Sequence, residues 1–228
     1  FTMSEAVLEN VNLRQPRGGI GFLAQLGPKS EQEFEKDPRK AMELMQILTA
    51  YGFGKFEMRG LEMQVPGVER LRLAGFSIND FSSDLLGSLA LDRLEVAVKD
   101  QANVAVRRFA FGGLVPPALD DFIAAVEAQA SGDDVDFSSV IPQLGFVEAA
   151  GIDVRVADMP RTTLESFRMD MKNYLGPIPT TISWDLVDAD IDAQLIEDED
   201  ARAMLDALGY DRVVVSSSLN ANWSEAGD

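Results

Sequence analysis

The chain has 228 residues, 46% of them hydrophobic, and its 38 acidic and 20 basic side chains give a formal charge of -18 at pH 7. A chain of this size and composition can bury a sizeable core, and its negative charge repels nucleic-acid phosphates and anionic lipid headgroups. The sequence contains neither Cys nor His, which excludes disulfides, thiolate and imidazole metal ligands, thiol nucleophiles and the commonest general base.

The first half of the chain predicts a strand, a helix and two hairpins. AVLENVNL is typical of a strand, and a Gly- and Pro-rich break follows it. Asp37 caps a helix that begins at Pro38 and ends at Gly52. Alternating apolar residues then predict four strands, with a phase slip at Gly60 that indicates a β-bulge. These strands lie at 55–65, 69–78, 91–100 and 104–113.

The second half predicts three helices and four strands. An apolar stripe indicates a helix over 117–130 that Gly132 stops, and a shorter helix follows over 140–150. The last helix lies at 200–209. The predicted strands lie at 151–159, 164–176, 180–195 and 210–223.

One phrase occurs twice, as LTAYGFGKFEM at 48–58 and LDALGYDRVVV at 205–215. Gly52, Gly151 and Gly209 are each predicted to end a helix and to lead at once into a strand. Duplication explains this, with repeat units 37–115 and 137–228, but so do the common needs of any helix-to-strand corner.

The predicted fold is a single domain over 1–228, of class α+β. It contains a long twisted, mainly antiparallel sheet, and the helices inserted between the hairpins pack on one face. The last strand needs a partner, so we expect a longer parent chain, unless this strand pairs elsewhere in the sheet or forms its edge.

No motif nominates a catalytic residue, a cofactor or a metal site. Asp188, Asp190 and Asp192 share one face of a predicted strand, but side chains two residues apart lie about 7 Å from one another, which is wide for one calcium ion. A solvated face is the competing interpretation. The acidic loop around 131–139 is better explained by helix capping and solvation than by calcium binding.

Long flexible and aromatic side chains on the predicted strands suggest an apolar ligand site. Met and Phe can line a groove for acyl chains, although ordinary core packing beneath helices explains the same pattern. The candidate residues are Met58, Met63, Phe76, Phe109, Phe111, Phe167, Met169, Met171 and Trp184.

LDALGYDRVVVSSSLNANW, VERLRLAGFSI and LGSLALDRLEV resemble the strand repeats of bacterial cell-envelope proteins of unknown function, broadly the AsmA-like kind. The resemblance implies a periplasmic or envelope location, with a signal or anchor outside this sequence, and a role in lipid handling or envelope maintenance. It carries no catalytic residues.

The sequence therefore predicts a non-enzymatic bacterial cell-envelope protein that binds lipid or another hydrophobic small molecule in a groove between sheet and helices. We expect no cofactor, no nucleic-acid partner and no transmembrane segment. The alternative is a structural or protein-interaction module, which uses its acidic surface or an exposed edge strand to bind a protein partner.

Overall fold

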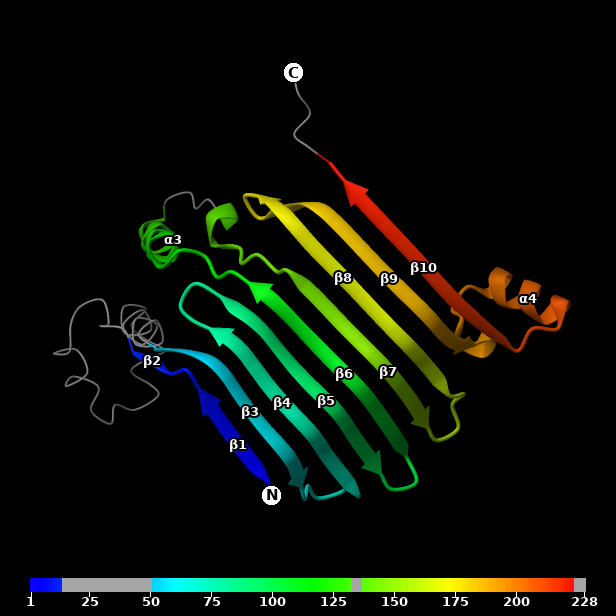
Figure 1. The fold of residues 1–228 in the computed structure, drawn as a ribbon. Helices are drawn as coiled ribbons and strands as arrows, with labels where there is room; N and C mark the ends of the chain where they lie inside the picture. Colours follow the sequence, from blue (N-terminus) through cyan, green and yellow to red (C-terminus); the bar gives the residue numbers. More distant parts are fainter. Residues whose placement is uncertain (14–50, 133–136, 224–228) are drawn as a thin grey trace.

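The computed structural model describes residues 1–13, 51–132 and 137–223, and these form one antiparallel sheet of ten strands (Figure 1). Neighbours in the sheet are neighbours in sequence, in the order β1-β3-β4-β5-β6-β7-β8-β9-β10, and β2 pairs with β3 beside β1. The strands are β1 (Glu5–Glu9), β2 (Asn12–Leu13), β3 (Tyr51–Met63), β4 (Arg70–Phe81), β5 (Leu86–Val98), β6 (Ala102–Leu114), β7 (Phe146–Val156), β8 (Thr162–Leu175), β9 (Ile178–Asp192) and β10 (Arg212–Asn222).

The helices of the described residues lie at the ends of the strands and not across the sheet (Figure 1). α3 (Leu119–Ser131) contacts the short 3-10 helix η2 (Phe137–Val140), and α4 (Glu199–Leu208) contacts η3 (Ala193–Leu195). The class is therefore mainly β, and the prediction of an α+β fold with helices packed on one sheet face is wrong. An amphipathic pattern indicates that a helix has an apolar side, but it does not say which surface that side meets.

Two of the three predicted glycine corners are also wrong. Gly209 does end α4 in the left-handed conformation, with φ 76°. Gly52 is instead the second residue of β3 and pairs with Asn12, while the rest of the predicted helix from Pro38 lies outside the described residues. Gly151 lies in the middle of β7, so the helix predicted over 140–150 does not form.

β7 is paired on both sides, with β6 and with β8. Ala149, for example, lies opposite Phe109 of β6 and Phe167 of β8. Cross-strand pairing thus overrides the helix propensity of Ala and Glu in FVEAAG.

The alternation of side chains slips at the same level in every strand from β3 to β9. The slip positions, here called the bend line, are Gly60, Ala74, Arg93, Arg107, Gly151, Glu165 and Asp188. On alternate strands the bend-line residue has a positive φ: 65° at Gly60, 51° at Arg93, 59° at Gly151 and 48° at Asp188. Because β3 to β9 slip together, cross-strand neighbours in these strands remain on the same face. β10 keeps the ordinary alternation, and its Ser216 lies opposite both Val187 and Asp188, as at a β-bulge.

Consecutive residues at the bend line share a face. Asp92 and Arg93, and likewise Arg107 and Arg108, line a single hollow, whereas consecutive residues of a regular strand point to opposite faces. Apolar residues are therefore three positions apart across the bend line and two apart on either side of it, as in Leu71, Leu73, Phe76 and Ile78. This spacing keeps them all on one face of the sheet.

The described residues bury few side chains, as expected for a sheet that forms a single layer. The fully buried side chains are those of four alanines, Ala90, Ala110, Ala150 and Ala193, and no large side chain joins them. Domains normally bury one sheet face against a second layer. In the described part of the chain, neither helix supplies that layer.

Gly151→Ala tests the geometry of the bend line. A Cβ at position 151 would lie 2.6 Å from the Arg107 Cβ and would also strain the backbone at φ 59°. We expect a loss of about 2 kcal/mol or more in the free energy of unfolding, measured by urea denaturation.

Gly67→Ala is the matched control, because Gly67 has φ 83° but a Cβ added there would meet no other atom within 4 Å. It should cost only the backbone strain, about 1 kcal/mol. Equal losses in the two variants would mean that Arg107 does not pack over Gly151.

Candidate functional site: the apolar face of the sheet

One face of the sheet is apolar from edge to edge, and we call it the apolar face. Its side chains form transverse rows, because each apolar residue lies opposite an apolar residue of the next strand. The longest row crosses nine strands through Leu8, Phe56, Ile78, Leu89, Phe111, Val147, Met169, Trp184 and Leu219. The adjacent row runs through Ala6, Met58, Phe76, Leu91, Phe109, Ala149, Phe167 and Leu186.

Two further rows lie beyond the bend line. The first of them contains Leu61, Leu73, Leu94, Val106, Ile152, Leu164, Ala189 and Val215. The second begins at Met63 and continues through Leu71, Val96, Val104 and Val154. Four rows of this kind span about 40 Å across the strands and about 25 Å along them, from the usual strand spacing and rise.

The structure brings all nine of the predicted ligand residues onto the apolar face. Phe111, Met169 and Trp184 lie in the longest row, and Met171 lies two residues beyond Met169, opposite Ile182. Met58, Phe76, Phe109 and Phe167 share the adjacent row, and Met63 lies in the outermost one. Met63, Phe109 and Trp184 keep 40%, 37% and 39% of their surface exposed, so the face is open to solvent.

Aromatic rings pack against one another at the β3–β4 side of the apolar face. Phe53 stacks on Phe81 with ring centroids 5.1 Å apart, and Phe56 meets Phe76 edge-to-face at 6.1 Å. Phe109 and Phe111 form a further pair within β6, at 6.5 Å. Such pairs fix the orientation of large side chains that no helix of the described ranges covers.

The predicted groove between sheet and helices is absent from the described residues, because α3 and α4 lie beyond the strand ends. α4 has no buried residue, and its Met204 and Leu208 are exposed. The candidate site is therefore an open surface and not a covered groove.

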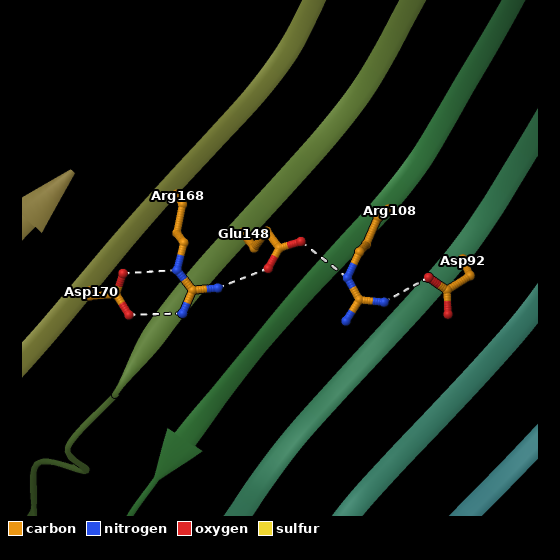
Figure 2. A network of polar contacts seen from close by, with 5 residues as sticks. All are labelled: Asp92, Arg108, Glu148, Arg168 and Asp170. Carbon is orange, nitrogen blue, oxygen red and sulfur yellow. Dashed lines mark hydrogen bonds and ion pairs between the residues drawn. The ribbon is translucent and has the colours of Figure 1, made fainter. Parts of the chain in front are cut away.

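The opposite, polar face carries a chain of ion pairs across four strands (Figure 2). Arg108 of β6 donates to Asp92 of β5 at 2.8 Å and to Glu148 of β7 at 3.1 Å. Arg168 of β8 donates to Glu148 at 2.9 Å and makes two bonds to Asp170, which lower the pKa of that carboxyl group. Alternating charges thus link β5 to β8 on this face.

Among the acidic side chains of the described residues, Asp153 of β7 has the most strongly lowered pKa. It accepts bidentate hydrogen bonds from Arg161, at 2.8 and 2.9 Å, and from Arg155, at 3.0 and 3.3 Å. These bonds hold the pKa of Asp153 far below the ordinary value of an aspartate.

The three aspartates considered for calcium have other partners. Asp190 accepts a hydrogen bond from Arg212 at 2.8 Å, and Asp192 caps η3 by accepting from the Gln194 N–H. Asp188 lies on the bend line and accepts from the Ser216 hydroxyl. No cluster of three acidic residues that could hold a metal ion occurs in the described ranges.

Sequence reasoning missed the polar-face ion pairs and most of the bend line. The signal for the bend line is present, since the spacing of two, then three, then two that marks Gly60 recurs in β4, β5 and β6. The ion pairs leave no comparable signal, because their partners are up to 58 residues apart, as in Arg107 and Glu165.

Comparison of the chain with protein-family models, curated proteins and solved structures gave no match. Across residues 1–13, 51–132 and 137–223, no helix has both the length and the hydropathy needed to cross a bilayer.

Asp153→Asn should reduce stability in a pH-dependent way. A carboxylate whose pKa is lowered on folding stabilises the protein above its unfolded pKa, near 4, and loses that contribution as the pH falls towards its folded pKa. At pH 7 we expect the variant to melt about 2–4 °C lower, because both guanidinium groups are largely solvent-exposed.

Melting temperatures of the wild type and the variant, measured by circular dichroism from pH 2 to pH 7, check this. The difference between them should shrink steadily below about pH 4. A difference that stays constant across this range would show that the charge of Asp153 contributes nothing to stability.

Proposed function

We propose that this protein binds lipid acyl chains, or a ligand of similar hydrophobicity, along the apolar face of its sheet. The observation that carries the proposal is the set of unbroken apolar rows, which cross as many as nine strands without a helix above them in the described residues.

The size of the apolar face supports a binding role. Its four rows project over about 1,000 Å², whereas the largest apolar patch of a typical monomer covers about 300–600 Å². A surface of this extent in contact with water is costly, at about 25 cal/mol for each Å² that a ligand would cover. Covering it with acyl chains therefore supplies a large driving force for binding.

The residue types favour flexible chains over a rigid ligand. Met58, Met63, Met169 and Met171 are unbranched side chains that adapt to irregular partners. Phe and Trp beside them provide broad, fixed surfaces against which methylene groups can pack. An extended acyl chain needs no specific polar group along its length, and the rows offer none.

The proposed role is non-catalytic, and the proposed location is the bacterial cell envelope. The lack of Cys and His supports the first part, because few nucleophile or general-base arrangements remain. The second part rests on the resemblance of the strand phrases to AsmA-like envelope proteins.

The fluorescence of Trp184 provides a direct test. In a Trp223→Phe background Trp184 is the only tryptophan, and it lies in the longest apolar row. Addition of a fatty acid brominated in its acyl chain should quench this emission in a saturable way. Native mass spectrometry of the purified protein should in parallel reveal co-purifying lipid.

Phe167→Asn and Ser166→Asn form a matched pair of variants in that background. The two residues are adjacent in β8, but Phe167 lies on the apolar face and Ser166 on the other. Phe167→Asn should weaken fatty-acid binding by about tenfold, since one buried aromatic contact is lost. Ser166→Asn should leave it unchanged. Absence of quenching, or equal effects of both variants, would refute the proposal.

A protein-interaction role is the alternative, and the edge position of β10 in the described sheet favours it. Within the described residues β10 pairs with β9 alone, and Arg212 is its single charged residue. Val214 and Leu219 are 60% and 41% exposed. Natural edge strands normally carry charges or prolines that prevent pairing with another chain, so this edge is suited to accept an added strand.

Ser218→Lys tests this alternative. A lysine on the edge strand should reduce self-association or partner capture, followed by sedimentation velocity at increasing protein concentration. Ser77→Lys, on the interior strand β4, is the control and should have no effect. A chain that sediments as a monomer at every concentration, with and without the substitution, would exclude self-association through β10.

A further inference from the structure

We propose that a second copy of this chain pairs with β10, so that two sheets join edge to edge as a symmetric dimer. The inference rests on the edge-strand alternative given above and not on lipid binding, and it names the partner of that edge. Within the described residues β10 pairs with β9 alone, so its other side can accept a strand.

The outer side of β10 presents an unbroken series of backbone donors and acceptors. The Trp223 N–H donates to the Thr180 carbonyl at one end of the strand, and the Ala193 N–H donates to the Asp211 carbonyl at the other end, both at 2.9 Å. Backbone groups alternate in direction along an antiparallel strand, so the odd-numbered residues of β10 bond to β9 and the even-numbered ones point away from it. The outward groups at the centre of the strand belong to Val214, Ser216, Ser218 and Asn220.

β10 also lacks the features that normally protect an edge strand. Its own alternation is regular, whereas β3 to β9 slip at the bend line, and its central residues 214–220 contain no charge and no proline. The opposite edge differs, because β1 and β2 are short, β1 carries Glu5 and Glu9, and Asn10 between the two strands has φ 55°. Bulges, charges and short strands prevent edge pairing, so β10 is the better edge for a second copy.

The sequence of β10 is complementary to itself in antiparallel pairing. In the register that sets Ser217 opposite the partner's Ser217, Val215 lies opposite the partner's Leu219. On the other face, Ser216 lies opposite the partner's Ser218. Apolar side chains then face apolar ones and hydroxyl groups face hydroxyl groups, which are favourable cross-strand pairs. Twofold symmetry makes each of these unequal pairs occur twice.

This register also extends the apolar face into the partner. The twofold axis passes through Ser217 perpendicular to the sheet, so the apolar faces of both copies lie on the same side. The row that contains Trp184 ends at Leu219 in one copy and continues at the partner's Val215. Figure 1 shows α4 beside the start of β10, so we confine the pairing to residues 214–220.

Charge distinguishes a second copy from a basic protein partner. Two chains of net charge -18 repel each other at long range. Residues 214–220 are uncharged, so no like charges face each other within the pairing itself. Salt screens repulsion between exposed charges, so sodium chloride should strengthen the dimer, whereas it would weaken binding of a basic partner to the acidic surface.

Ser217→Cys tests the register, because the natural chain contains no cysteine. In the proposed dimer the two introduced thiols lie opposite each other at a position without backbone hydrogen bonds between the copies. The Cα atoms of such a pair are about 4.5 Å apart, which is within the range of a disulfide. Mild oxidation should therefore give a covalent dimer, measured by non-reducing electrophoresis.

Ser218→Cys is the matched control, because Ser218 is the next residue of β10 and is also exposed. It lies opposite the partner's Ser216, so the two copies of residue 218 are diagonal neighbours about 7–8 Å apart. This distance is too long for a disulfide. We expect Ser217→Cys to form the covalent dimer at least about tenfold faster than Ser218→Cys.

Sedimentation velocity of the wild type should show a dimer whose fraction rises with protein concentration and with sodium chloride. Equal rates of cross-linking in the two cysteine variants, or cross-linking in neither, would overturn the symmetric dimer. If Ser218→Lys then still abolishes capture of a different protein, the edge role of β10 holds and only the second copy is excluded. Quenching of Trp184 by a brominated fatty acid reports on lipid binding separately.

Discussion

The slip in side-chain alternation at the bend line is the constraint on which the rest of the structure depends. In a sheet, a one-residue shift in a single strand would send all its following side chains to the other face. Here the slip occurs at the same level in every strand from β3 to β9, so the shift is cancelled between neighbours. One face thereby remains apolar on both sides of the bend line.

The same constraint explains which contacts stabilise each face of the sheet. On the apolar face, residues of neighbouring strands lie directly opposite each other, and pairs such as Phe53 and Phe81 stack. On the polar face, consecutive residues at the bend line point the same way, which brings Arg107 across Gly151 to Glu165. The sheet, which no other described element covers, thus has cross-strand contacts on both of its surfaces.

The strands are predictable because alternation is a local signal, and it locates all of β3 to β6 and β8 to β10. The arrangement of helices and strands in space is harder to predict from the sequence. The sequence suggests helix ends at Gly52 and Gly151, because a glycine before an apolar run has the same local appearance at a helix end and within a strand. FVEAAG suggests part of a helix, because Ala and Glu favour helices when tertiary pairing is ignored.

The candidate site, too, could be predicted from the sequence only in part. Each of the nine apolar residues is identified from its type and its place on a strand, and the cross-strand register then puts all of them on one face. The hollow on the polar face that several arginines line is not predicted. Arg59, Arg93 and Arg107 are distant in sequence, and only the register of β3, β5 and β6 brings them together.

At the bend line, positive φ values occur on every second strand, so each left-handed residue lies between two strands that lack one at that level. A hairpin added to such a sheet preserves this order, because it brings one strand of each kind. Because each strand pairs with its sequence neighbours, an added hairpin also finds its partners locally and does not raise the relative contact order. Growth in steps of two strands would thus extend both faces at once and leave the speed of folding nearly unchanged.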